Sequence, residues 1–154
     1  MLGAQVFKES VSAVTNTPSV ELGTVRYDGE DKYIYCYNAS NSVIEQGACV
    51  TLSGVTGYSV TCSLVTDVGN IFGAVKNVSM DTGDYGWILK KGFTVLLASN
   101  TSITPGALAT PDDGLNGRIS LFTLSSGQLP LDIQVVQTLS TTGCAVTGAA
   151  YLDL

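Results

Sequence analysis

The chain has 154 residues, of which 45% are hydrophobic and only 13% are charged, and its formal net charge is −6 at pH 7. This length is typical of a single domain and is sufficient to bury a core without disulfides or metals. With 7 basic and 13 acidic residues, the composition excludes the broad basic surface that nucleic acids and anionic membranes attract. We therefore expect no nucleic acid and no membrane among its partners.

The cysteines and the N-terminal stretch both indicate a reducing compartment. The first residues, MLGAQVFKES, lack the basic start and continuous apolar core of a signal peptide, and no apolar run approaches the ~20 residues that span a bilayer. We expect synthesis in a cytoplasm, where Cys36, Cys49, Cys62 and Cys144 remain free thiols that act as small hydrophobic residues. None of the four belongs to a C-x-x-C motif.

Residues 1–20 differ in pattern from the rest of the chain. They mix small and β-branched residues and carry no firm turn signal before Pro18. Two interpretations stay open for this segment: an extended N-terminal arm that pairs with a neighbouring chain, or an ordinary first strand. Residues 21–154 are predicted to form one all-β domain.

The segment YDGEDKYIYCYN, residues 27–38, predicts a strand, an Asp-Gly turn and a second strand. In the second strand Ile34 and Cys36 share one face. Three tyrosines share the other face, and they lie at Tyr33, Tyr35 and Tyr37. We interpret them as a half-buried sheet face in preference to the lining of an exposed pocket.

Similar strand signals continue to the C-terminus. Short runs rich in β-branched and aromatic residues alternate with turn signals about every 8–12 residues, and no segment carries a good helix pattern. This spacing predicts an all-β fold, either a β-sandwich or a β-barrel-like domain.

One internal repeat stands out. The stretch from Ile44 to Thr61 resembles the stretch from Ile103 to Ser120, because both contain Ile-x-x-Gly-Ala, a strand, a turn and a glycine that leads into another strand. The repeat predicts two related hairpins, each started by a tight glycine turn.

The segment TGDYGWILKKG, residues 82–92, carries the only tryptophan of the chain. Gly83 is predicted to make a turn, after which Tyr85 and Trp87 fall on one face of a strand. Gly86 between these two aromatic residues indicates a bulge or a close approach. We interpret Trp87 as an anchor in the core or at a subunit interface.

Motifs for catalysis and cofactor binding are absent from the sequence. The chain has no histidine, which excludes Ser-His-Asp and Cys-His catalysis and most zinc sites. Each group of neighbouring carboxylates lies in a predicted turn beside a glycine, where Asp stabilises its own backbone. These groups are Asp28 with Glu30 and Asp31, Asp81 with Asp84, and Asp112 with Asp113. We expect no enzymatic activity, no cofactor and no metal.

The motif GDYGW at the start of a strand, preceded by IFGAVKNVSMDTG and followed by ITPGALA, resembles the capsid decoration, or cement, proteins of tailed bacteriophages. The resemblance covers roughly Gly23 to Ile119. It includes GTVRYDGEDKYIYCYNASNSVIEQGACVTL, which is similar to their opening hairpin, in which a hydroxyl-rich or Asn-rich turn precedes Ile-x-x-Gly. It implies a virion protein that forms a homotrimer on the outside of an icosahedral head. There it would clamp neighbouring subunits of the major capsid protein.

Large apolar side chains near the termini and around the tryptophan are the candidate interface residues. They are Val6, Phe7, Tyr85, Trp87, Tyr151 and Leu152. The terminal arm is a candidate for adding a strand to a capsid sheet edge, so deletion of residues 1–15 is predicted to weaken capsid binding and leave the domain folded.

Other functions stay open from the sequence. One is a different trimeric virion component, such as a fibre, a tail protein or a receptor-binding protein. A small hydrolase that uses paired carboxylates and a glycan-binding module are further alternatives.

Overall fold

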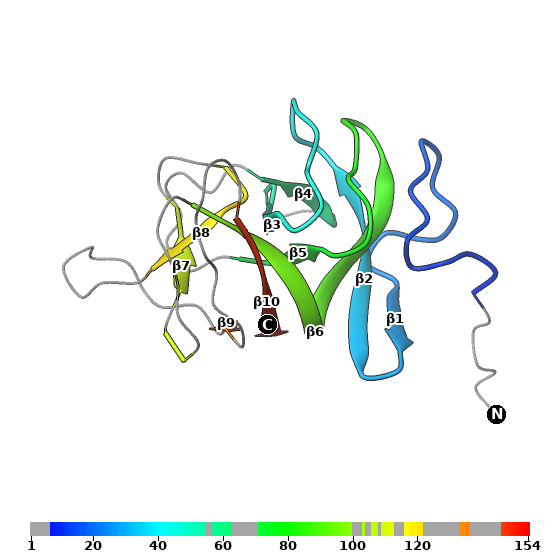
Figure 1. Ribbon diagram of the computed structural model, residues 1–154. Coiled ribbons are helices and arrows are strands. Elements are labelled where there is room, and N and C mark those ends of the chain that lie inside the picture. Colours follow the sequence, from blue (N-terminus) through cyan, green and yellow to red (C-terminus); the bar gives the residue numbers. More distant parts are fainter. Residues whose placement is uncertain are drawn as a thin grey trace.

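The computed structural model describes residues 7–54, 57–62, 71–99, 103, 106–107, 109–112, 116–121, 133–135 and 146–154 (Figure 1). These residues form ten strands and no helix. The prediction of a single all-β domain is therefore confirmed.

The ten strands are numbered in chain order. Those of the first half are β1 (Val25–Asp28), β2 (Asp31–Asn38), β3 (Cys49–Leu52), β4 (Ser59–Thr61), β5 (Gly73–Val75) and β6 (Tyr85–Ala98). Those of the second half are β7 (Ala109–Pro111), β8 (Ile119–Leu121), β9 (Ile133–Val135) and β10 (Val146–Asp153).

Five of these strands close into a small barrel. Strand β2 pairs with β6, β6 with β5, β5 with β3 and β3 with β4, all antiparallel, and β4 returns to pair with β2 in parallel. The sequence left a sandwich and a barrel-like fold open, and this ring of pairings is barrel-like.

Every barrel strand contributes an inward-facing apolar side chain to a buried interior cluster. Its members include Ile34, Cys36, Val50, Val60, Val75 and Ile88. Met80 also belongs to this cluster, and a Cβ on Gly86 would lie 3.1 Å from its sulfur. Gly86 thus leaves room for Met80, which agrees with the close approach predicted at this glycine.

A second buried cluster covers the outer face of the same strands. It contains Tyr33, Tyr35 and Trp87 from the barrel, together with Leu96 and Leu152 from the β6–β10 pair. The alternation predicted for residues 31–38 is confirmed, because the tyrosines and Ile34 face different clusters. Tyr33 and Tyr35 are only 2% and 1% exposed, so they do not line an open pocket.

Strand β6 joins the barrel to the rest of the molecule. Its first half pairs with β2 and β5, and its second half pairs antiparallel with β10, which in turn pairs with β9. Figure 1 shows it as one long, curved strand that crosses the molecule between the two parts. The residues after Gly92 therefore continue the strand.

Gly92 marks the point at which β6 leaves the barrel. Its φ is +132°, and a Cβ built there would lie 1.9 Å from Oδ1 of Asp31. The other carboxylate oxygen of Asp31 accepts hydrogen bonds from the ammonium of Lys76 and, at 3.1 Å, from the hydroxyl of Tyr33. We call these four residues the Asp31 junction; it connects β2, the segment after β5, and β6.

The predicted internal repeat is present as two antiparallel hairpins, β3–β4 and β7–β8. Each unit starts with a fully buried isoleucine, Ile44 or Ile103, and a glycine with positive φ, Gly47 at 85° or Gly106 at 80°. The two units also contact each other, since the amide of Cys49 donates to the carbonyl of Gly117 at 2.8 Å.

Residues 7–24 lie against the outer side of the barrel at β2 and β6 (Figure 1). Thr15 and Tyr85 exchange two backbone hydrogen bonds of 3.0 and 2.7 Å as an isolated bridge. The Ser19 hydroxyl donates to the phenolic oxygen of Tyr35 at 3.0 Å. These contacts integrate the segment from residue 7 onward into the domain.

We predict that Gly92→Ala lowers the free energy of unfolding by about 3 kcal/mol, because the new methyl group meets Asp31 and positive φ disfavours alanine. Gly29→Ala is the matched control, since Gly29 also has positive φ but has no atom within 4 Å of a Cβ. It should cost only about 1 kcal/mol. Urea unfolding measures both values, and equal losses would contradict the close contact with Asp31.

Candidate functional site

The predicted interface residue Trp87 is buried beneath the N-terminal segment. It is 4% exposed, and the Phe7 ring packs edge-on against it with centroids 5.3 Å apart. The guanidinium of Arg26 lies 5.0 Å from the Phe7 ring centroid and 5.7 Å from that of Trp87. Trp87 is thus a core residue of its own chain, and Phe7 is its cover. Val6 lies outside the described residues.

Leu152 is also a core residue, with no exposed surface in the β6–β10 pair. Tyr85 is half-buried, and its ring packs against those of Tyr35 and Tyr37. Of the two roles that the sequence left open for Trp87, the structure places it in the core of its own chain, and Leu152 lies in the core as well. Alternate residues of a strand point to opposite faces, and the side chains of Trp87 and Leu152 lie on the face that packs in the second buried cluster.

The remaining candidate, Tyr151, lies on an exposed apolar surface. It pairs across the strands with Phe93, with ring centroids 5.0 Å apart, and Val95 follows two residues further along the same face of β6. Phe93 is 56% exposed and Val95 47%. We call Phe93, Val95 and Tyr151 the outer apolar strip.

Phe93 and Val95 are the contact candidates that sequence reasoning missed. The alternation in FTVLL places them on one face, but a pattern does not tell which face of a strand is covered. In the structure Leu96 points into the core while Phe93 and Val95 point outward.

The charged groups beside the outer apolar strip already have partners. At one end the ammonium of Lys91 donates to Asp153 at 2.9 Å, and this hydrogen bond raises the pKa of Lys91. Lys76 lines a shallow hollow of about 300 Å³ beside Phe93, and it pairs with Asp31. Both lysines would therefore keep a counter-charge if a partner buried the strip.

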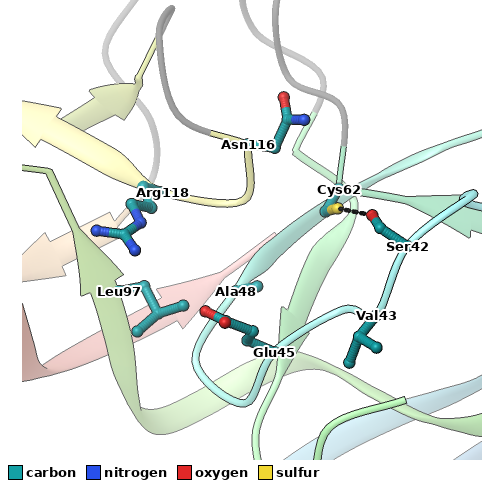
Figure 2. A pocket seen from close by; sticks show the side chains of 8 residues that line it. All are labelled: Ser42, Val43, Glu45, Ala48, Cys62, Leu97, Asn116 and Arg118. Atoms are coloured by element: carbon teal, nitrogen blue, oxygen red, sulfur yellow. Dashed lines mark hydrogen bonds between the residues drawn. The ribbon is translucent and has the colours of Figure 1, made fainter. Parts of the chain in front are cut away.

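A separate pocket of about 460 Å³ lies between the two repeat units (Figure 2). Residues of both units and of β6 line it. They are Ser42, Val43, Glu45, Ala48, Cys62, Leu97, Asn116 and Arg118. Its lining thus combines apolar side chains with one carboxylate and one guanidinium.

In two of the predicted carboxylate groups one member has a structural role: Asp84 binds the backbone and Asp31 forms an ion pair. Asp84 accepts a hydrogen bond of 3.0 Å from the amide of Asp81, as expected of a turn residue. Asp28 and Asp31 face each other across the β1–β2 hairpin. Asp113 lies outside the described residues, and the described part of the chain holds no cluster of three or more metal-ligating side chains.

Two of the thiols and one amine have altered acidity through burial. Burial raises the pKa of the Cys49 thiol to about 12 and also raises that of Cys36. Burial, and then the nearby charge of Lys32, lowers the pKa of Lys90. The ammonium of Lys90 donates to the carbonyl of Phe72 and lies 4.1 Å from the centroid of its ring. These interactions fix Lys90 against the barrel wall.

A scan against protein-family models found no match for this chain, and a search of the curated proteins also found none. In the described residues there is no helix long and apolar enough to cross a membrane.

We predict that Cys36 and Cys49 stay unlabelled by N-ethylmaleimide in the native protein from pH 7 to pH 9. A pKa of about 12 leaves only about 10⁻⁴ of Cys49 as the reactive thiolate at pH 8, and both thiols are fully buried. Peptide mass spectrometry measures the labelling, with the same protein in urea as the control. Native labelling within minutes at pH 9 would contradict this burial.

Proposed function

We propose that this chain is a structural virion protein of the decoration, or cement, class, which binds the outer surface of a tailed-phage head as a homotrimer and holds adjacent major capsid protein subunits together. The observation that carries the proposal is the outer apolar strip, in which Phe93 and Val95 stand exposed on a strand that is paired with β10. The resemblance of GDYGW and its flanking segments to decoration proteins supports the same function.

The physical basis is the burial of a small apolar area on a rigid support. Burial of one large apolar side chain contributes about 1.5–3 kcal/mol, and the pairing of β6 with β10 holds Phe93 and Tyr151 in place before binding. Each copy then needs only weak binding, because a trimer joins several such contacts through effective concentration. The low charge content suits close and neutral packing against a protein surface.

The experiment that tests this function is the copy number of the chain in purified particles, measured by quantitative mass spectrometry against the major capsid protein. We expect a number equal to that of the capsid protein or a simple lattice fraction of it. A few copies per particle would assign the chain to a tail or fibre, and absence from particles would contradict a virion role.

The double variant Phe93→Ser with Val95→Ser tests the contact surface in the same assay. It should reduce occupancy on particles at least about tenfold, because binding then buries two fewer apolar side chains. Tyr27→Ser is the matched control, since Tyr27 is 68% exposed but lies on β1. Equal effects of the two variants would remove the outer apolar strip from the proposal.

The structure changes the expectation for N-terminal deletions. Deletion of residues 1–15 removes the Phe7 cover of Trp87 and both backbone hydrogen bonds that Thr15 makes with Tyr85. We now predict a loss of about 2–4 kcal/mol in the free energy of unfolding, measured in urea. Deletion of residues 1–6 alone is the clean test of a capsid-binding arm. It should weaken occupancy on particles, and unchanged occupancy would contradict the arm.

A further inference from the structure

Backbone hydrogen bonds hold two walls of the pocket in Figure 2 in place. One wall is the loop around Glu45, which is fixed to β6 because the Leu97 amide donates to the carbonyl of Gly47 at 2.8 Å. The opposite wall is the turn at Gly117, which accepts the 2.8 Å bond from Cys49, while the Arg118 carbonyl accepts from Asp112 at 2.9 Å. The geometry of the pocket therefore follows from the contact between the two repeat units.

The base of the pocket is apolar. Leu97, Ala48 and Cys62 line it and are 6%, 3% and 7% exposed. No aromatic side chain is among the described residues that line it, so these residues offer no ring surface on which a sugar would stack. A short aliphatic group fits this base, because contact with it removes apolar surface from water on both sides.

The rim of the pocket carries one charge of each sign. Glu45 from the first repeat unit and Arg118 from the second both line the cavity (Figure 2). The ion pairs among the described residues are Lys76–Asp31 and Lys91–Asp153, and neither Glu45 nor Arg118 forms an ion pair with another described residue. Two opposite charges beside an apolar base are complementary to a ligand with the inverse arrangement.

We propose that this pocket binds a small aliphatic zwitterion of the α-amino-acid class. Arg118 binds the carboxylate, Glu45 binds the ammonium group, and Leu97 with Ala48 contacts the aliphatic side chain. The cavity of about 460 Å³ lies within the roughly 300–1,000 Å³ range of small-molecule sites. This site is independent of the proposed capsid contact, because the outer apolar strip does not line it.

The test is a titration of the full chain, labelled with ¹⁵N, followed by ¹H–¹⁵N correlation spectra. Leucine carries both charges, N-acetyl-leucine only the carboxylate, and leucinamide only the ammonium. We expect leucine to shift the amides of Ala48, Leu97 and Arg118 saturably, and to bind at least about tenfold more tightly than either analogue. Absence of saturable shifts, or equal affinity for all three compounds, would overturn the proposal.

Two charge-neutralising variants assign the roles of the rim. Arg118→Gln should weaken leucine and N-acetyl-leucine at least about tenfold and leave leucinamide unchanged, whereas Glu45→Gln should weaken leucine and leucinamide and leave N-acetyl-leucine unchanged. Glu30→Gln, an exposed carboxylate in the β1–β2 turn, is the matched control and should change none of the three. Equal losses for all compounds would indicate a folding effect and would overturn the assigned roles.

Discussion

The bend of β6 at the Asp31 junction is the constraint on which the rest of the structure depends. Asp31 occupies the space beside Gly92 that a side chain would fill, and its second oxygen binds Lys76 and Tyr33. One strand can therefore close the barrel with its first half and pair with β10 with its second half. Burial and the negative charge of Asp31 both raise the pKa of the Tyr33 phenol, which keeps it a hydrogen-bond donor to the junction.

The two halves of β6 differ in what covers them, and this difference separates structural residues from candidate contact residues. In the first half the barrel interior covers one face, while residues 7–24 and the second cluster cover the other, so Trp87 becomes part of the core. In the second half one face lies against the core throughout, whereas the other is exposed at Phe93 and Val95 and becomes buried only at Leu97. The apolar surface proposed to bind a capsid is therefore the part of β6 that no other described segment covers.

The repeat units have a related role. Each is a short hairpin that begins at a glycine turn, and neither is large enough to form a core alone. Their contact through Cys49 and Gly117 joins the first unit to the second, and the pocket with Glu45 and Arg118 forms between them. A Cβ on Gly117 would lie 2.9 Å from the Cβ of Ala48, so the close contact depends on this glycine.

The sequence by itself determined the all-β class, the hairpin at residues 27–38, the two repeat units and the turn role of Asp84, because alternation and turn chemistry are local properties. It also determined which residues share a face of β2. Only the tertiary structure decided which faces are covered: it placed Trp87 and Leu152 in the core and left Phe93 and Val95 exposed. Likewise it brought Glu45 and Arg118 into one pocket. Coverage and long-range proximity depend on strand pairings between distant segments, and no local pattern records them.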